Sequence, residues 1–184
     1  MGDFDRLAIS GKMTSGKTTV ANMLERELGY TRMFFADELK ILCRDIANYN
    51  KAANAGLEAE ARKPLLEIIW NDIQRITSTD EEYEAAMNQV LRILEDFKHI
   101  THYDPRSDKK TNDVRKMLQQ VGTEYMRENV SDDIWVNALE KNIKRSKATK
   151  IVVDDMRYPN EFEMLRRNGF VMIRLDVSKE TMLE

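Results

Sequence analysis

Apolar positions along the chain follow two different spacings, and each spacing predicts its own kind of element. Short apolar runs, typical of buried strands, occur at 7–10, 31–36 and 150–153. Between them apolar residues recur at helical spacing, first over Thr18–Leu28. Phe170–Val177 alternates apolar with charged residues and predicts a half-exposed strand at a sheet edge. Strands alternating with helices predict a parallel sheet wrapped by helices.

The middle of the chain has a different pattern. Residues 50–112 contain no strand pattern. Pro64 predicts the start of one helix, and Thr79 with Glu82 forms a capping box that predicts another, running to about Ile100. We interpret this stretch as a helical insertion in an α/β core.

Composition excludes several function classes. The 184 residues are 42% hydrophobic, enough for the core of one domain, and no apolar run is long enough for a membrane helix or a secretory signal. The single cysteine, Cys43, and the two histidines, His99 and His102, exclude a disulfide framework and argue against zinc centres and histidine-based catalysis. The net charge of −3 does not favour nucleic-acid binding. We therefore expect a cytoplasmic domain without membrane or nucleic-acid partners.

Residues 11–18 carry the pattern G-x-x-x-x-G-K-[ST], directly after a predicted strand and at the start of a predicted helix. Glycine lets the backbone bend around a phosphate, and successive N–H groups at the helix start then point at the anion. Lys17 would place its charge on the β- and γ-phosphates, and the Thr18 hydroxyl suits Mg²⁺. The candidate cofactor-binding residues are Gly11, Lys12, Thr14, Ser15, Gly16, Lys17, Thr18 and Thr19.

Charged residues follow the third predicted strand. Asp154 and Asp155 end it, where P-loop proteins keep the acid that holds or orients the magnesium shell. An aspartate there can instead cap the next turn. Arg157 lies just beyond, in the crevice where such sheets bind ligands, and either clamps a phosphate or is solvated. Asn160 belongs to the same short stretch.

Two further groups are candidates for binding a second ligand. Asp37 begins the helix after the second strand, with Lys40 one turn later. Asp37 is either an N-cap or an acid near an acceptor group. A helix predicted over 113–129 has an apolar stripe on one face. Its other face is either solvated or lines a ligand, and it carries Arg115, Gln119, Thr123 and Arg127 beside the small Gly122.

Four segments together resemble the phage-type deoxynucleoside monophosphate kinases, which are P-loop kinases. They are SGKMTSGKTTVANMLERELG (10–29), FFADELK (34–40), LQQVGTEYMRENVSDDIWV (118–136) and VVDDMRYPNEFEMLRRNG (152–169). The Gln-x-x-Gly-Thr-Glu helix paired with Asp-Asp-x-Arg-x-x-Asn-Glu is more specific than the P-loop alone. The resemblance extends to about Val177 and is weakest over 50–112.

This resemblance implies a single P-loop kinase domain over 1–184, with a nucleoside monophosphate kinase-like three-layer α/β/α fold and a helical insertion. The implied reaction transfers the γ-phosphoryl group of ATP to a deoxynucleoside monophosphate, with Mg²⁺. Residues 11–18 would hold the ATP phosphates, and Asp155 would help to organise the metal. The implied acceptor side comprises Asp37, Lys40, Gln119, Gly122, Thr123, Arg127, Arg157 and Asn160, of which Asp37 and Arg157, with Lys17, are the candidate catalytic residues.

One departure from the family concerns the end of the chain. Relatives continue past the fourth strand into an arginine-bearing lid, whereas this sequence stops at Glu184 after VSKETMLE. Without a lid we expect slow transfer and a high ratio of ATP hydrolysis to transfer. The strand at 170–177 would also leave an open edge, which predicts pairing of two copies as a homodimer.

Three other readings compete with this one. Dephospho-CoA kinase shares a P-loop followed by an aspartate after the second strand, and P-loop phosphomevalonate kinase is a further rival. A noncatalytic nucleotide-binding switch or assembly protein would leave Asp37, Arg127 and Arg157 without an acceptor to serve. Small nucleotides are the expected binding partners. The expected location is the cytoplasm, which is that of the host if a phage encodes the chain.

Overall fold

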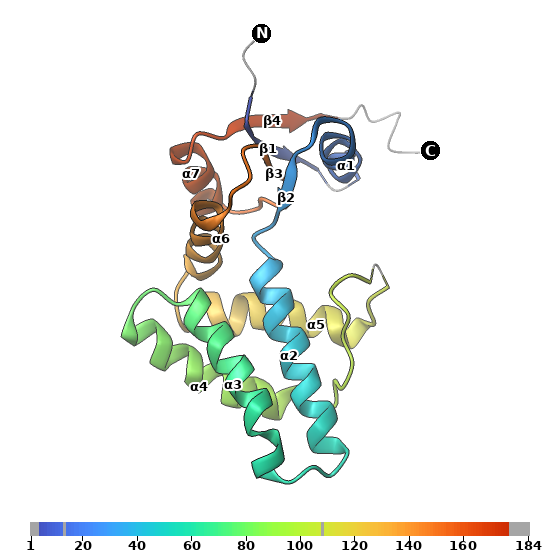
Figure 1. Cartoon of the computed structure of the whole chain (residues 1–184), viewed down its shortest axis with the longest axis vertical. Helices are drawn as coiled ribbons and strands as arrows, with labels where there is room; N and C mark the ends of the chain where they lie inside the picture. The colour runs from blue at the N-terminus through green and yellow to red at the C-terminus, as the bar shows by residue number, and fades with distance from the viewer. Residues whose placement is uncertain (1–3, 13, 108, 177–184) are drawn as a thin grey trace. The chain divides into compact units, whose positions relative to one another are not determined.

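A computed structural model of the chain describes residues 4–12, 14–107 and 109–176 (Figure 1). By its internal contacts the chain divides into two compact units. The sheet unit comprises Met1–Phe35 and Leu139–Glu184, and the helical unit comprises Ala36–Ala138. Val177 and the segment 178–184, to which the expectation of a missing lid refers, lie outside the described residues, as do Met13 and Asp108.

The sheet unit contains four parallel strands in the order β2-β3-β1-β4. The strands are β1 (Arg6–Gly11), β2 (Thr31–Met33), β3 (Ile151–Val153) and β4 (Val171–Leu175). Ala8 pairs with Val153, so β1 and β3 end at the same edge of the sheet. The position of β4 at the end of the order confirms the predicted edge strand.

Helices cover both faces of this sheet. α1 (Lys17–Leu28) buries Ala21 against Leu7, Ile9 and Val152. Because successive strand residues point to opposite faces, the buried Ala8 belongs to the other face. Figure 1 shows α7 (Pro159–Arg167) and the end of α6 (Ile134–Arg145) on that side. The predicted α/β/α arrangement around a parallel sheet is confirmed.

The helical unit has its own apolar core. It consists of α2 (Asp37–Asn54), α3 (Ala59–Ile76), α4 (Asp80–Asp96), α5 (Asn112–Gln120), the π-helical segment η1 (Val121–Arg127) and the start of α6. Leu42, Ile73, Ile93 and Met117 are completely buried in this core. The predicted insertion, 50–112, falls within the unit, whose bounds are wider. Among the described residues no helix combines the length and apolar character needed to cross a membrane.

Three of the predicted element ends differ from the observed ones for a reason that the structure shows. Pro64 lies inside α3, which begins more than one turn earlier at Ala59, so the proline removes one bond of the helical ladder instead of starting the helix. α4 is capped by Thr79, whose hydroxyl accepts from Glu82 N–H at 3.1 Å, but it ends at Asp96 rather than near residue 100. β2 ends at Met33 because the N–H of Phe35 leaves the ladder and donates to Asp155.

Candidate active site

The loop between β1 and α1 bends at glycines that cannot be replaced without a clash or strain. Gly11 has φ 153°, and a Cβ there would lie 2.5 Å from Ser15 Oγ and 2.7 Å from the Leu175 carbonyl oxygen. Gly16, with φ 84°, occupies the N-cap position of α1. Thr14 also has a positive φ, 66°, which costs a non-glycine residue about 1 kcal/mol or more. The loop is thus held in a compact conformation by Gly11, Thr14 and Gly16, all at positive φ.

Two side chains of the loop fit an anionic ligand. The Lys17 ammonium folds back over the loop and donates to the carbonyl oxygens of Gly11 (2.8 Å) and Lys12 (2.6 Å). The Ser15 hydroxyl is buried and has no hydrogen-bond partner among the described residues. A buried unpartnered hydroxyl is costly, so a phosphate oxygen that bonded to it would stabilise the loop.

The start of α1 adds a positive electrostatic potential. The first N–H groups of a helix have no acceptor within the helix, and the helix dipole favours negative charge there. The first turn of α1 contains no acidic residue, and its N-cap glycine has no side chain to cap it. Thr18 and Thr19 are exposed in this turn. The start of α1 is therefore suited to bind an anion.

Asp154 is committed to an ion pair within the sheet unit. Arg32, on β2, donates from Nε to Asp154 Oδ1 at 3.0 Å and from Nη2 to Asp154 Oδ2 at 2.5 Å. The third guanidinium nitrogen, Nη1, donates to Asn22 Oδ1 on α1 at 2.7 Å. The Asp154 side chain is only 4% exposed. The guanidinium thus joins β2, the end of β3 and the helix that begins at the P-loop.

Asp155 is the second acid at this strand end, and it is half-buried. Its Oδ1 accepts the N–H of Phe35 at 3.1 Å. Register places it at the edge of the sheet where β1 enters the P-loop. Among the described residues no cluster of three or more His, Cys, Asp or Glu side chains is suited to a metal. The donors present, the Thr18 hydroxyl and one carboxylate, fit Mg²⁺, which takes most of its ligands from phosphates and water.

The residues after β3 divide into a structural and an exposed group. Glu161 is 2% exposed, and its Oε2 accepts the N–H groups of Arg157 (2.6 Å) and Tyr158 (3.0 Å), which caps α7. Asn160 Oδ1 accepts the Glu161 N–H at 3.0 Å. The Arg157 side chain is exposed. Of this stretch, Arg157 is therefore the residue whose guanidinium is accessible to an anion.

In the helical unit, Asp37 and Lys40 lie in the first turn of α2. The N-cap position belongs to Ala36, so Asp37 is the first helical residue and not the cap that one interpretation expected. Lys40 Nζ lies 4.0 Å from Asp37 Oδ1. Both side chains are partly exposed, at 28% for Lys40 and 43% for Asp37. The pair is accessible from solvent within its own unit.

The helix predicted over 113–129 contains a π-helical turn. α5 ends at Gln120, and the N–H of Glu128 bonds five residues back, to the Thr123 carbonyl at 3.0 Å. Side chains four residues apart therefore no longer align. Gln119 is exposed and Thr123 half-buried, but Arg127 is only 8% exposed. The prediction that Arg115, Gln119, Thr123 and Arg127 share one polar face is wrong at Arg127.

Packing around Gly122 accounts for part of the π-helical turn in η1. A Cβ on Gly122 would lie 2.9 Å from Leu39 Cδ2, so its small size accommodates that side chain. The Gly122 carbonyl accepts the indole N–H of Trp135 at 2.9 Å. The Arg127 guanidinium donates from Nη1 to the Asp132 carbonyl at 2.9 Å. That these residues also border a nucleotide stays a prediction.

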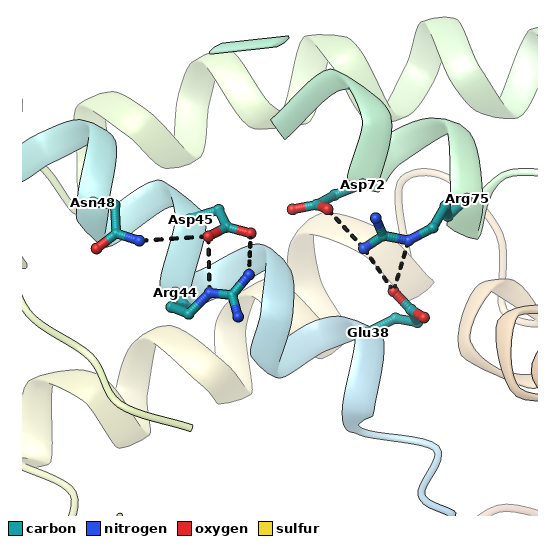
Figure 2. Close-up of polar contacts among 6 residues, drawn as sticks. All are labelled: Glu38, Arg44, Asp45, Asn48, Asp72 and Arg75. Carbon is teal, nitrogen blue, oxygen red and sulfur yellow. Dashed lines mark hydrogen bonds and ion pairs between the residues drawn. The ribbon is translucent and has the colours of Figure 1, made fainter. Parts of the chain in front are cut away.

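The sequence did not predict two polar networks. One joins Arg32 to Asn22 and to Asp154, of which Asp154 alone was a candidate residue. The other links α2 to α3 and comprises Glu38, Arg44, Asp45, Asn48, Asp72 and Arg75 (Figure 2). The signal was a charged residue inside an apolar pattern: Arg32 in the strand TRM, and Asp72 on the helical stripe of Ile69, Ile73 and Ile76.

The fold and the loop define the class of this chain, a P-loop nucleotide-binding protein. It belongs to the AAA domain family, whose model matches residues 7–184. Over 55 residues it is 48% identical to the deoxynucleoside-5'-monophosphate kinase of Escherichia phage T5. This match covers 30% of this chain and 22% of the length of that kinase. It is 26% identical over 183 residues to a protein of Acanthamoeba polyphaga mimivirus named "Putative deoxynucleotide monophosphate kinase", covering 92% of this chain and 72% of the relative. The predicted resemblance to this kinase family is confirmed.

Proposed function

We propose that this chain transfers the γ-phosphoryl group of ATP to the phosphate of a deoxynucleoside monophosphate. The observation that carries the proposal is the phosphate cradle between β1 and α1, with Lys17 folded over it and the buried Ser15 hydroxyl unpartnered among the described residues. The names of the two relatives support deoxynucleoside monophosphates as the acceptors.

On the donor side, the loop and the start of α1 would bind the ATP phosphates through backbone N–H groups. Lys17 would exchange its two carbonyl bonds for phosphate oxygens and stabilise the charge on the transferring group. The Thr18 hydroxyl and the Asp155 carboxylate would hold Mg²⁺, whose chemistry is to neutralise charge on the phosphates.

On the acceptor side, Arg157 is the strongest candidate for the monophosphate, since its exposed guanidinium is suited to bidentate binding of a dianion. Asp37 and Lys40 would bind the acceptor from the first turn of α2. Gln119 and Thr123 would border the nucleotide. Arg127 is buried. We assign it a structural role in the turn that contains Gln119 and Thr123, in addition to its predicted role toward the acceptor.

A screen of acceptors tests the proposal. The full chain is incubated with ATP, Mg²⁺ and one acceptor at a time: each deoxynucleoside monophosphate, dephospho-CoA and phosphomevalonate. We expect a diphosphate product from at least one deoxynucleoside monophosphate and none from the other two acceptors. Product only from dephospho-CoA or phosphomevalonate would replace the proposal with that activity. ATP binding without any product would support the noncatalytic reading.

A matched pair of lysine variants separates chemistry from general charge. Lys17→Ala should lower the rate of transfer by on the order of a hundredfold or more, the scale for loss of one positioned electrostatic donor. Lys147→Ala removes an exposed lysine of the same unit and should leave the rate unchanged. Equal rates for both variants and the parent chain would contradict the role of the loop. Chromatography of the chain tests the predicted homodimer separately.

A further inference from the structure

Two buried carboxyl groups face each other inside the helical unit. Asp45 lies on α2 and is 6% exposed, and Asp72 lies on α3 and is 2% exposed. Figure 2 shows their side chains pointing toward one another from the two helices. Two ionised carboxylates at close range repel strongly in a buried setting, and such pairs usually hold a proton.

The surrounding charges do not balance the pair. Asp45 binds Arg44 through two bonds, Nε to Oδ1 at 2.8 Å and Nη2 to Oδ2 at 2.7 Å. Arg75 Nη2 binds both Asp72 Oδ1, at 2.7 Å, and Glu38 Oε2, at 3.1 Å. Within this cluster three acids therefore meet two guanidinium groups (Figure 2). One added proton makes the cluster neutral.

An orphaned atom shows where the proton belongs. Asp72 Oδ2 is buried and has no hydrogen-bond partner among the described residues. As a hydroxyl it would donate to the carboxylate of Asp45. Burial raises the pKa of Asp72 to about 7; the charge of Arg75 lowers it and the charge of Asp45 raises it. The charge of Arg44 also interacts with Asp72, and Glu38 shares the Arg75 guanidinium with it.

We propose that Asp45 and Asp72 share one proton between α2 and α3, and that this proton keeps Arg75 on Glu38 and so positions the first turn of α2. Without the proton the two carboxylates repel, and the ionised Asp72 draws Arg75 away from Glu38. The effect on the first turn matters for catalysis only if the proposed function is correct, because its consequence runs through Asp37 and Lys40.

The proton gives the helical unit an unusual dependence on pH. An acid whose pKa is higher in the folded state binds its proton more tightly there, so folding is favoured at low pH. The benefit is full below the unfolded pKa of 3.8 and is lost as the pH rises through about 7. One proton changes the unfolding constant by at most about tenfold per pH unit in this window.

The first test measures urea unfolding of the full chain between pH 5.5 and 8. Fluorescence reports the helical unit, because both tryptophans, Trp70 and Trp135, lie in it. Asp72→Asn keeps the shape of the protonated acid without its titration. Its unfolding constant, relative to the parent chain, should fall about thirtyfold from pH 5.5 to 8, because the parent constant rises about tenfold per pH unit and levels off above about pH 7. Glu67→Gln removes an exposed charge from the same helix and should keep the parent dependence. Equal slopes for both variants would overturn the proposal.

A second measurement needs neither variant. The carboxyl ¹³C signal of Asp72 in the full chain, followed by NMR, should titrate with an apparent pKa of about 7, and the signal of Asp45 should respond in the same pH range because the two groups share the proton. Titration of both groups below pH 5 would refute the shared proton even if Asp72→Asn failed to fold.

Kinetics test the positioning role. The KM for the acceptor should rise from pH 6 to 8 more in the parent chain than in Asp72→Asn, while the KM for ATP follows the same course in both. Ionisation of the acceptor's own phosphate is common to both proteins and cancels in this comparison. A shared proton by NMR with no difference in acceptor KM would remove the positioning role. Absence of any transfer would refute the proposed function and leave the proton tested by NMR.

Discussion

Replacement of Arg32 by methionine tests whether the end of β3 depends on one ion pair. The variant keeps most of the side-chain volume but removes both bonds to Asp154 and the bond to Asn22. Asp154 then remains as a carboxylate that is 4% exposed and has lost its cation. Removal of one partner from a buried pair costs about 3–5 kcal/mol. Because Arg32 is itself 14% exposed, we expect the lower part of that range, about 3 kcal/mol.

A double-mutant cycle with Asp154→Asn distinguishes an uncompensated charge from lost packing. Asp154→Asn should destabilise the parent chain, because Arg32 loses its anion. The same substitution should stabilise Arg32→Met, because it removes the unpaired charge. Urea unfolding gives the free energies, and hydrogen exchange of β1 and β3 localises the effect to the sheet unit. Arg26→Met, an exposed arginine on α1, is the control and should change stability by no more than about 0.5 kcal/mol.

The opposite signs of Asp154→Asn in the two backgrounds are the decisive result. If the substitution destabilises Arg32→Met as much as it destabilises the parent chain, the two residues act independently and the reasoning is refuted. Asp155 follows directly in the sequence, so the proposed function adds a kinetic expectation: the double variant recovers stability without full recovery of the transfer rate.

Three further predictions concern single positions. Gly11→Ala should abolish ATP binding in calorimetry, because its Cβ would meet a backbone oxygen at 2.7 Å, whereas Gly56→Ala, also at positive φ but with open space around it, should retain binding. Arg157→Ala should weaken monophosphate binding more than ATP binding without loss of stability. Arg127→Ala should also lower the melting temperature, because Arg127 is buried. Equal losses of affinity for both ligands in Arg157→Ala would contradict the role of Arg157. The hydrogen bond from Asn168, with Arg167 and Lys144, lowers the pKa of Glu140 to about 2 against the desolvation of burial. Because Arg167 and Lys144 are more than half exposed and solvent screens their charges, Glu140→Gln should cost about 1 kcal/mol at pH 7 in urea unfolding. This cost should shrink as the pH falls from 4.5 towards 2.

Local chemistry made part of this molecule predictable from its sequence. The P-loop, the capping residue Thr79 and the edge strand β4 are each encoded within a few neighbouring residues. Their hydrogen bonds and backbone angles follow from residue type and spacing. The prediction of a parallel sheet needed only the alternation of strands with helices.

Features that depend on distant contacts were not predictable in this way. Arg32 and Asp154 are 122 residues apart in the sequence, and the local sequence around each residue does not indicate that the other is its partner. The π-helical turn of η1 arises where Gly122 packs on Leu39 and bonds Trp135, and periodicity alone predicts an α-helix there. Asp72 interrupts the apolar stripe of α3, and no local spacing indicates that Asp45 lies opposite it on α2.

The central claim, transfer of a phosphoryl group to a deoxynucleoside monophosphate, is tested most directly by ³¹P NMR of one reaction. The full chain is mixed with ATP, Mg²⁺ and the acceptor that the screen selects, and the phosphorus signals are followed over time. We predict that the deoxynucleoside diphosphate appears together with ADP, that any excess of ADP is matched by inorganic phosphate, and that Lys17→Ala suppresses both nucleotide products. Appearance of ADP with inorganic phosphate and no deoxynucleoside diphosphate would show hydrolysis without transfer and would contradict the account.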